Sequence, residues 1–437
     1  MFNGRSVGFF GLGSSNLTLM SMPEFRQAEI TIRSDRKIDR SVIPKGLNIA
    51  EIFECDNACK DIKEEIIFFS PSVRRERVEL QLAKERGVIF SSDAEMFFEA
   101  NCKPIFAISG SDGKSTTSTL ADLMLKNSGL DSRLIGNIGE PMYGYVGSAE
   151  MFVCELSSFM LRYHLPKTKR ACITNITPNH LDWHKDFSEY RECKISLLRE
   201  ADEFVITDDL AEISGGFGIV SYKKSFRELR ENYKADVYYT VEDGFINRNG
   251  ERAIPIVEIA RSESYNLTNI MLAMAMTEGF ASRDAMLTVA RGFSGLEHRC
   301  EKFLSVDGVD YFDSSIDTSP ARTCQTLMAL GRPAVVILGG KSKGLDYSKL
   351  IPALKKYDHK VVITGENRSE IFSSLSVEID CSVVEDFRDA IRLGNDIAKD
   401  SGALILSPAS TSYDRFSDYR HRGNEFKRII IDLHKGE

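Results

Sequence analysis

The sequence lacks the features that mark secreted, membrane-spanning or disulfide-stabilised proteins. Its nine cysteines are scattered and odd in number, and no CxxC pair occurs, so a disulfide framework, a zinc cluster and a CxxC redox motif have little support. No stretch approaches the roughly 18 consecutive apolar residues of a transmembrane helix, and the first residues lack the basic and apolar regions of a signal peptide. We therefore expect a soluble, cytoplasmic protein without a membrane partner.

Positive charge is not in excess either. The chain carries 56 basic and 64 acidic residues, a formal net charge of −8, whereas proteins that bind nucleic acid usually show a basic excess or a basic stripe. The closest approach to a basic cluster, Arg74-Arg75-Glu76-Arg77, is interrupted by an acidic residue and is typical of a solvated helix face. We therefore expect no nucleic-acid partner.

What is present is the composition of an ordinary globular chain, with 42% hydrophobic and 27% charged residues. At roughly 100–200 residues per domain, the 437 residues are enough for three domains. Short apolar runs end in Gly, Ser or Asp and are followed by helical stretches, a pattern typical of βαβ units. The expected strands are 6–10, 28–32, 104–108, 151–154, 309–312, 334–338, 360–364 and 403–406.

Continuous apolar runs of this kind indicate buried parallel strands, so the predicted fold class is α/β with mostly parallel sheets. A new strand–glycine–helix unit begins after residue 103 and a further strand after residue 300, which predicts domains 1–100, 101–300 and 301–437. Ligands of such sheets bind at the carboxyl ends of the strands. The unusual residues of this chain follow its expected strands.

The strongest local signal is the glycine-rich segment 107–117, in which Gly113-Lys114-Ser115 opens a helix directly after a strand. Backbone amides of such a loop cradle phosphates, and Lys114 adds a positive charge. The Ser115 hydroxyl would complete a Mg²⁺ site. Ile108 stands where the common GxxxxGK[ST] motif has its first glycine, and a plain helix-capping loop is the alternative. We predict a nucleoside triphosphate site.

Two further segments are consistent with nucleotide and metal binding. Gly11-Leu12-Gly13 follows the first strand, but Asn16 replaces the third glycine of GxGxxG, so a dinucleotide and another nucleotide-like ligand both stay open. Glu155 and His180 follow two central strands, and Lys194 lies on the next helix. A carboxylate suits Mg²⁺, whereas His180 alone would be a structural residue and Lys194 alone a surface lysine.

In the last third of the chain, hydroxyl and lysine side chains follow two expected strands, in 339–344 and 407–412, and 418–426 comes next. Hydroxyls and lysines at strand ends can hold an anionic substrate by charge-assisted hydrogen bonds. Ordinary loops with helix caps are the alternative at these positions.

Taken in order, these segments resemble the Mur ligases, which build the peptidoglycan stem peptide, over essentially the whole chain. The segment 110–116 looks like the ATP loop of the family, and 136–139, 155–159, 265–269 and 296–299 fall where the family has its own motifs. The resemblance implies a Rossmann-like N-terminal domain for the UDP substrate, a central P-loop-type ATPase domain and a Rossmann-like C-terminal domain for the amino acid. Within the family, the segments 155–159 and 407–426 are most similar to the member that adds D-glutamate to UDP-N-acetylmuramoyl-L-alanine.

The resemblance also implies roles for individual residues, with Lys114, His180 and Lys194 as catalytic residues. The ATP-binding residues would be Gly110, Ser111, Asp112, Gly113, Lys114, Ser115, Thr116, Asn269, Arg299 and Asp313. The ligands of two Mg²⁺ ions would be Ser115, Glu155, His180 and a carbamylated Lys194. The substrate-binding residues would be Ser14, Ser15, Asp35, Asn137 and Ser157 for the UDP-muramoyl part, and Lys343, Ser412 and Tyr419 for the amino acid.

The chain departs from the family pattern in three segments. Tyr265 replaces a usual histidine, Ser315-Ile316-Asp317 replaces the last three residues of Asp-Ser-Lys-Ala-Thr, and Tyr419 replaces a usual phenylalanine. Without the lysine at 315, the glutamate site needs another cation, and we predict Lys343, with Lys341 and Arg322 as helpers.

The alternatives are a sibling ligase or a folylpolyglutamate synthase-like enzyme with another acceptor, a non-catalytic nucleotide-binding relative, and a nicotinamide enzyme. The retained Lys114, Glu155, His180 and Lys194 speak against a non-catalytic relative. The altered glycine motif is the only support for a nicotinamide enzyme. We expect an ATP-dependent, monomeric amide-bond-forming ligase.

Overall fold

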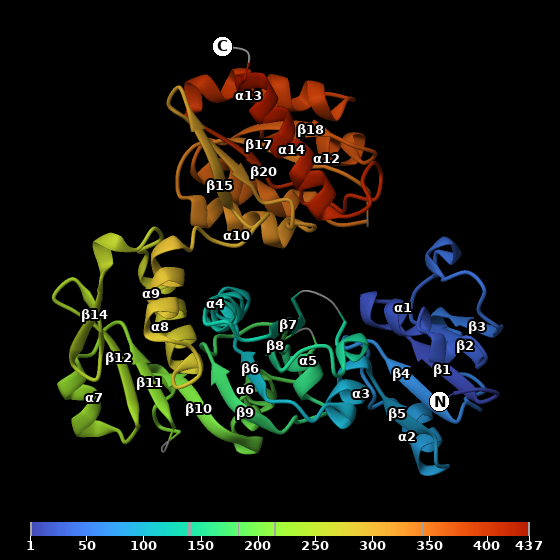
Figure 1. Ribbon diagram of the computed structural model, residues 1–437. Coiled ribbons are helices and arrows are strands. Elements are labelled where there is room, and N and C mark those ends of the chain that lie inside the picture. Colours follow the sequence, from blue (N-terminus) through green and yellow to red (C-terminus); the bar gives the residue numbers. More distant parts are fainter. Residues whose placement is uncertain (1, 139–140, 182, 214–215, 343, 436–437) are drawn as a thin grey trace. The chain divides into compact units, whose positions relative to one another are not determined.

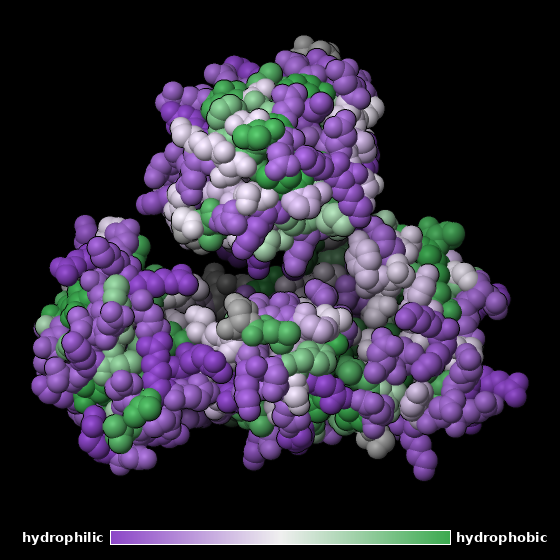
Figure 2. Space-filling model, turned by 180° about the vertical axis from the view of Figure 1, so that it is seen from behind, coloured by the Kyte–Doolittle hydropathy of each residue, from purple (hydrophilic) through white to green (hydrophobic). Residues whose placement is uncertain are grey.

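The computed structural model describes residues 2–138, 141–181, 183–213, 216–342 and 344–435, and the chain forms two compact units, residues 1–293 and 294–437. The first unit contains two β-sheets and the second contains one (Figure 1). Apolar side chains are buried in the cores of these sheets and their helices. On the face shown in Figure 2, hydrophilic residues predominate and hydrophobic residues occur in small groups.

The N-terminal sheet has five parallel strands in the order β3-β2-β1-β4-β5. The strands are β1 (Ser6–Phe10), β2 (Glu29–Ser34), β3 (Ile49–Glu54), β4 (Ile66–Phe69) and β5 (Ile89–Ser91), and the helices are α1 (Ser14–Met20), α2 (Val78–Glu85) and α3 (Asp93–Ala100). Phe9, Phe25 and Phe68 pack in mutual ring contact in the core. Because all strands are parallel, the residues that follow β1, β2 and β4 meet at one edge of the sheet.

The central sheet has nine strands in the order β14-β13-β12-β11-β10-β9-β6-β8-β7. Its strands are β6 (Ile105–Ser109), β7 (Ser132–Gly136), β8 (Met151–Glu155), β9 (Thr168–Ile173), β10 (Ala201–Thr207), β11 (Gly218–Ser221), β12 (Val237–Glu242), β13 (Phe245–Arg248) and β14 (Glu251–Pro255). Its helices are α4 (Lys114–Asn127), α5 (Ser158–Leu161), α6 (Phe187–Ile195), α7 (Phe226–Asn232), α8 (Ser264–Thr277) and α9 (Arg283–Gly292). The strands from β7 to β12 are parallel, and β12, β13 and β14 form an antiparallel meander at one edge.

The second unit has a six-stranded sheet in the order β15-β16-β20-β17-β18-β19, parallel except for the antiparallel edge strand β15. Its strands are β15 (Glu301–Val306), β16 (Val309–Asp313), β17 (Val335–Gly339), β18 (Lys360–Thr364), β19 (Cys381–Val383) and β20 (Ala403–Leu406). Its helices are α10 (Pro320–Leu330), α11 (Ile351–Lys356), α12 (Arg368–Leu375), α13 (Phe387–Ser401) and α14 (Tyr419–His434).

The α/β fold class predicted from the sequence is confirmed, and the expected strands are present with ends that differ by at most two residues. Strand β6, for example, begins at Ile105 and includes Ser109, because its register with β9 pairs Ser109 with Ile173. The division of the chain at residues 100 and 300 stays a prediction, since the first compact unit includes both the N-terminal and the central sheets. Within the described residues, no helix is both long and apolar enough to cross a membrane.

Candidate active site

The glycine loop between β6 and α4 has a backbone that only glycine adopts without strain. Gly110 has φ +146° and Gly113 has φ +79°, both in the region that favours glycine. A Cβ on Gly110 would overlap the hydroxyl of Thr174, and a Cβ on Gly113 would overlap the side-chain oxygen of Asn269. The two glycines therefore allow the loop to turn sharply and α4 to begin at Lys114.

Residues that follow β9 hold the loop in place. The amide of Asp112 donates to Asn175 Oδ1 (3.0 Å), and the hydroxyl of Ser111 shares a hydrogen bond of 2.8 Å with the hydroxyl of Tyr190. The Lys114 ammonium group crosses back over the loop and donates to the Ser111 backbone oxygen (2.8 Å). The predicted ATP-binding segment 110–116 thus forms a turn at the N-terminus of a 14-residue helix, which is a favourable place for phosphates.

Asn269, predicted for ATP from a distant part of the sequence, lies beside this loop. It is on α8, is 7% exposed, and its Oδ1 atom accepts a hydrogen bond from the Thr117 hydroxyl (3.3 Å). Helix α8 packs against α4, as Figure 1 shows, and this packing brings Asn269 against Gly113. The structure therefore brings together the loop and one of the three ATP-binding residues expected outside it.

Glu155 ends the strand next to β6 and carries a buried carboxylate with one oxygen left over. The residue is 1% exposed, and its Oε1 atom accepts a hydrogen bond from Asn137 Nδ2 (2.6 Å). Its Oε2 atom is buried and has no hydrogen-bond partner among the residues that the structure describes. A buried carboxylate oxygen without a donor is costly and is the type of ligand that Mg²⁺ prefers. Glu155 therefore fits the predicted metal site.

The predicted substrate residues Asn137 and Ser157 both lie near Glu155. Asn137 binds the Glu155 carboxylate through its side chain and the Glu155 backbone oxygen through its amide (2.9 Å). Ser157 caps the short helix α5, where its hydroxyl accepts from the Met160 amide (3.3 Å). In this structure Asn137 orients the carboxylate, and a contact of either side chain with substrate stays a prediction.

Lys194 lies directly beneath the phosphate loop. It is on α6, is 2% exposed, and its ammonium group donates to the Gly110 backbone oxygen (2.7 Å). Burial lowers the pKa of Lys194 to about 7, and the positive charge of Lys114 acts in the same direction. A large fraction of this amine is therefore neutral near pH 7, which a solvated lysine amine is not.

His180 lies in the turn after β9 and has a left-handed backbone, with φ +53°. The amides of Trp183 and His184 donate to its backbone oxygen (3.0 and 2.9 Å), and its ring contacts the ring of Phe159 at 4.9 Å between centroids. His184, which the sequence analysis did not single out, is buried and shares a hydrogen bond of 2.9 Å with the Ser158 hydroxyl. In the sequence, only its position shortly after His180 indicated that His184 belongs to the same loop.

The predicted residues of the N-terminal sheet lie at the carboxyl ends of its strands. Ser14 and Ser15 begin α1 after β1, and Asp35 follows β2, where its carboxylate pairs with both terminal nitrogens of Arg77 (2.5 Å each). Asn16 is fully buried and its amide donates to three backbone oxygens, those of Phe10, Gly11 and Phe68. The residue that breaks the GxGxxG pattern therefore joins strands β1 and β4.

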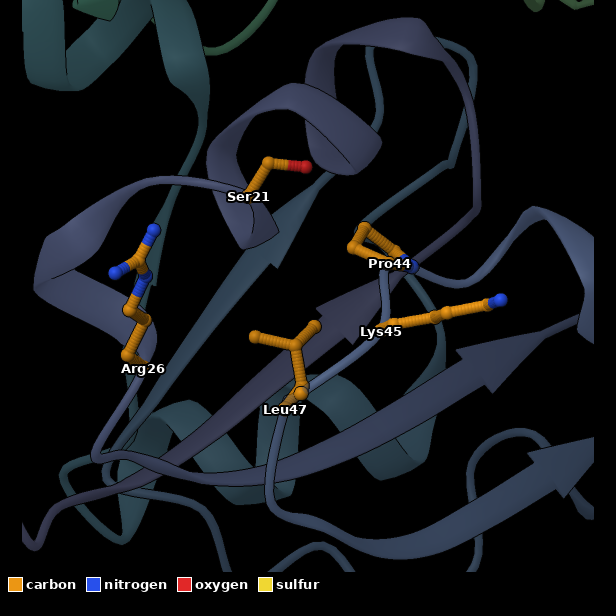
Figure 3. Close-up of a pocket in the computed structure, with 6 residues that line it drawn as sticks. Ser21, Arg26, Pro44, Lys45 and Leu47 are labelled. Atoms are coloured by element: carbon orange, nitrogen blue, oxygen red, sulfur yellow. The ribbon is translucent and has the colours of Figure 1, made fainter.

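A hollow of about 350 Å³ in the N-terminal sheet lies away from these residues (Figure 3). Its lining residues are Ser21, Arg26, Pro44, Lys45, Gly46 and Leu47. Arg26 precedes β2 and Leu47 precedes β3, so the hollow lies at the amino ends of these strands, opposite to Asp35. It is not part of the predicted substrate edge.

In the second unit, Asp313 ends β16 and is fully buried. Its Oδ2 atom shares a hydrogen bond of 2.6 Å with His298 Nδ1, and Lys427 lies 3.7 Å from the same oxygen. His298, Glu301 and Asp313 have ligand atoms within 4.8 Å of one another, but Lys427 also pairs with Glu301 (2.5 Å). The Lys427 ammonium group already pairs with both carboxylates of this cluster, so we do not assign a metal to it. Arg299, predicted for ATP, is exposed next to His298.

Two of the three residues predicted for the amino acid follow β20 in the chain. Ser412 is 2% exposed, Tyr419 begins α14, and Lys343 lies outside the described residues. The structure adds Arg422, which sequence reasoning missed. Arg422 is 1% exposed, its Nε atom donates to Ser315 Oγ (2.9 Å), and burial lowers its pKa to about 10.

Comparison with known proteins places this geometry among ligases. Residues 108–277 match the Mur ligase middle domain. The chain is 32% identical over 387 residues to the UDP-N-acetylmuramoylalanine–D-glutamate ligase of Clostridium botulinum strain Okra, covering 84% of this chain and 83% of that protein. The protein of the same name from strain Alaska E43 is 31% identical over 455 residues, covering 98% and 97% of the two chains.

A solved structure shows the same fold over the whole length. The UDP-N-acetylmuramate–alanine ligase of Thermotoga maritima superimposes with a TM-score of 0.57 and 17% sequence identity, covering 99% of this chain and 100% of that chain. At this identity the likeness establishes the fold and does not establish the substrate.

Proposed function

The chain belongs to the Mur ligase family, and from this premise we propose that it joins D-glutamate to UDP-N-acetylmuramoyl-L-alanine at the expense of ATP. One observation of the structure supports the ATP-dependent step of this proposal. The phosphate loop, the buried Glu155 with its unpartnered oxygen and the buried Lys194 meet at the carboxyl ends of β6 and β8. This is the arrangement that a phosphoryl-transfer site requires.

The proposed ATP site uses the loop 110–116 and the start of α4. Backbone amides at this helix N-terminus face the phosphates, and Lys114 adds a positive charge at the same place. Ser115 and Glu155 would hold Mg²⁺, which neutralises phosphate charge when it is bound. Asn269 fixes the loop from the side of α8 and contacts the nucleotide in this proposal.

The proposed reaction has two steps. The carboxylate of the UDP-muramoyl substrate attacks the γ-phosphorus of ATP, which releases ADP and leaves an acyl phosphate. The amine of D-glutamate then attacks the acyl carbon, loses a proton and expels inorganic phosphate. The protein contributes positioning and fixed positive charge, from Lys114 and the loop amides, rather than covalent chemistry.

We propose that Lys194 is carbamylated and that, with His180, it serves a second Mg²⁺. The amine adds to the carbon of CO₂, releases a proton and becomes a carbamate, so a cation turns into a carboxylate-like anion. Burial beneath Gly110 supports this step, since it excludes water and leaves the amine partly neutral. The change also gives the buried site an anion that can bind a metal.

The proposed setting is the bacterial cytoplasm, with the protein acting as a monomer on small-molecule substrates.

A release assay for inorganic phosphate tests the function. The complete mixture contains ATP, Mg²⁺, UDP-N-acetylmuramoyl-L-alanine and D-glutamate, and each component is omitted in turn. We expect release only from the complete mixture. Release with L-glutamate or L-alanine in place of D-glutamate, together with none from D-glutamate, would show that the acceptor is wrong.

A further inference from the structure

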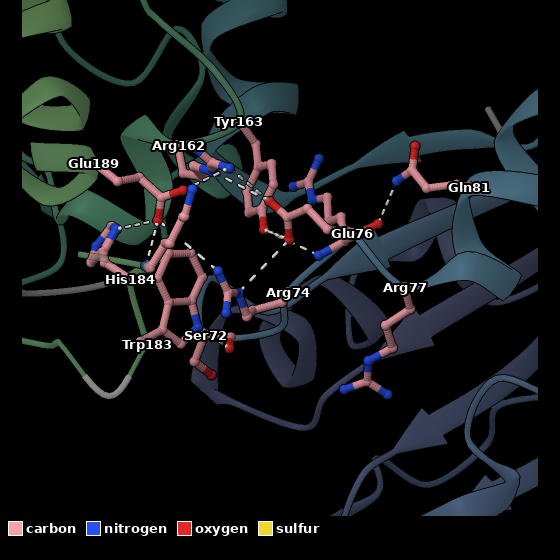
Figure 4. Close-up of polar contacts among 12 residues, drawn as sticks. Ser72, Arg74, Glu76, Arg77, Gln81, Arg162, Tyr163, Trp183, His184 and Glu189 are labelled. Carbon is pink, nitrogen blue, oxygen red and sulfur yellow. Dashed lines mark hydrogen bonds and ion pairs between the residues drawn. The ribbon is translucent and has the colours of Figure 1, made fainter.

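The turn after β4 and the loop that carries His180 are joined by a set of charged and aromatic side chains that the proposed reaction does not use (Figure 4). We call this set the latch; its members are Arg74, Glu76, Arg162, Tyr163, Trp183 and Glu189. Arg74 and Glu76 come from the N-terminal sheet, and the other four come from the central sheet region. The latch therefore connects two parts of the first unit that are far apart in sequence.

Glu189 is the centre of the latch on the central side. It lies in the first turn of α6, with its side chain 16% exposed, and accepts a hydrogen bond from the Lys185 amide (3.0 Å). The same carboxylate pairs with Arg162 (3.0 Å), with His184 Nδ1 (3.3 Å) and with Arg74 (4.0 Å). It therefore connects the His180 loop to α6, the helix that also carries Lys194.

On the other side, the turn after β4 is held at three points. The Tyr163 hydroxyl donates to Glu76 (2.9 Å), and Arg162 pairs with the same carboxylate (3.3 Å). The indole nitrogen of Trp183 donates to the Ser72 backbone oxygen (2.8 Å), and the Arg74 guanidinium lies 5.4 Å from the centre of the Trp183 ring. The Trp183 amide donates to the His180 backbone oxygen, so the contacts that position Trp183 also help to position His180.

The same turn also contacts the predicted substrate edge of the N-terminal sheet. The Ser70 hydroxyl donates to the Gly11 backbone oxygen (3.0 Å) and accepts from the Gly13 amide (3.2 Å). Arg77, at the other end of the turn, pairs with Asp35. A single segment, residues 70–77, thus touches both the proposed binding edge for the uridine diphosphate part and the loop with the proposed second metal ligand.

We propose that the latch couples binding of the UDP-muramoyl substrate to binding of Mg²⁺ at the His180 loop, with Glu189 as its positioning residue. The inference rests on the proposed function. Each ligand stabilises the turn 70–77 or the His180 loop. The latch contacts need both segments in their observed places, so a ligand that stabilises one segment also stabilises the other. Such coupling is reciprocal, so each ligand raises the affinity for the other by the same factor.

Isothermal titration calorimetry with UDP-N-acetylmuramoyl-L-alanine, in EDTA and in saturating Mg²⁺, measures the coupling without turnover because ATP is absent. For the unmodified protein we expect Mg²⁺ to lower the Kd about fivefold or more. Glu189→Gln and Glu76→Gln should reduce that ratio to below about twofold while changing the Kd in EDTA little. Glu76 is exposed, so the second variant is expected to fold even if Glu189→Gln does not.

Matched controls come from the same elements. Glu192→Gln changes an exposed residue of α6 and removes its ion pair with Arg199. Glu79→Gln changes an exposed residue of α2. Both controls should keep the full Mg²⁺ effect. The inference is wrong if the latch variants keep it too, or if Mg²⁺ does not change the Kd of the unmodified protein. A complete lack of substrate binding in both buffers would instead contradict the proposed function.

Trp183 gives a second readout, because it is the only tryptophan of the chain. Its emission should shift to longer wavelength in Glu76→Gln, since loss of the pairs to Arg162 and Tyr163 loosens the turn over the indole ring. Glu79→Gln should leave the emission unchanged. An unchanged spectrum in both would show that Glu76 does not hold the turn on Trp183.

Discussion

The buried guanidinium of Arg422 holds Ser315 by two hydrogen bonds, from Nε to the Ser315 hydroxyl and from Nη2 to the Ser315 backbone oxygen, each 2.9 Å long. Ser315 stands at the position where the resembling ligases have a lysine. A cation therefore does lie next to residue 315, but it is a side chain of α14, which is far from residue 315 in the sequence. Burial fixes the guanidinium, and with it Ser315, in one orientation, and the positive charge favours an anion nearby.

The first prediction concerns this pair. Arg422→Lys keeps the charge but loses the planar fork, so we expect the KM for D-glutamate to rise about tenfold or more, as for loss of one charge-assisted hydrogen bond worth about 1.5–3 kcal/mol. The KM for ATP should change little. Steady-state kinetics with each substrate varied measures both values. Arg420→Lys, on the exposed side of the same helix, is the control and should change neither. Equal changes in both KM values would contradict a role at the acceptor site.

The second prediction concerns the phosphate loop. Lys114→Ala should abolish phosphate release and leave the fold intact, because the lost charge matters most when phosphates are bound. Circular dichroism and thermal unfolding check the fold. Lys126→Ala removes a surface lysine from the same helix, where it pairs with Asp122 (2.7 Å), and should keep activity. An active Lys114→Ala variant would overturn the assignment of the ATP site.

The third prediction concerns the pH dependence of Lys194. Burial lowers its pKa to about 7 from an ordinary value of 10.5. Between these pH values the unfolded chain binds more protons at this residue than the folded chain does, so its contribution to stability rises with pH from about 7 to about 10. Lys194→Met should therefore remove part of the rise in unfolding free energy over this window. Urea unfolding of both proteins at pH 7 and pH 9 measures it, and parallel curves would show that Lys194 is not shifted.

The same residue gives a fourth, functional prediction. Lys194→Ala should be nearly inactive, because the site loses the proposed carbamate, and small carboxylates such as formate or acetate should restore part of the activity by occupying the vacated space. When CO₂ is removed from the unmodified protein and then supplied again, activity should return faster above pH 7 than below, since only the neutral amine adds to CO₂. Failure of every rescue, together with an unmodified lysine in a crystal structure, would count against carbamylation.

The sequence was sufficient to predict eight strands to within two residues, and the glycine loop, because both depend on local patterns. Buried parallel strands require continuous apolar runs, and the turn at Gly110 and Gly113 requires glycine. The contact of Asn269 with this loop followed from family resemblance and not from any local pattern. Arg422 was missed for the same reason: its partner lies 107 residues away, and only the packing of α14 on the sheet brings them together.

Glu155 shows the other limit of sequence reasoning. Its residue type and position after a strand indicated a metal ligand, but nothing in the sequence shows that Asn137 satisfies one carboxylate oxygen and leaves the other without a donor. Asn16 shows the reverse. This residue breaks the nucleotide-binding pattern GxGxxG in the sequence. The structure explains the asparagine, because its buried amide donates three hydrogen bonds to backbone oxygens.

The last prediction follows from the unpartnered oxygen of Glu155. A buried charge that lacks donors destabilises the metal-free fold, so Glu155→Gln should be at least as stable as the unmodified protein in EDTA. In Mg²⁺ the order should reverse: a ligand at 100 times its Kd stabilises the fold that binds it by about 2.7 kcal/mol, and the variant has lost the negatively charged oxygen that attracts the ion. Thermal unfolding in both buffers measures the effect, with Glu150→Gln, an exposed neighbour just before β8, as the control. If Mg²⁺ raises the Tm of Glu155→Gln as much as that of the unmodified protein, the ion binds elsewhere, because the structural reason for placing it at Glu155 is the buried, unpartnered carboxylate oxygen at the end of the strand next to β6.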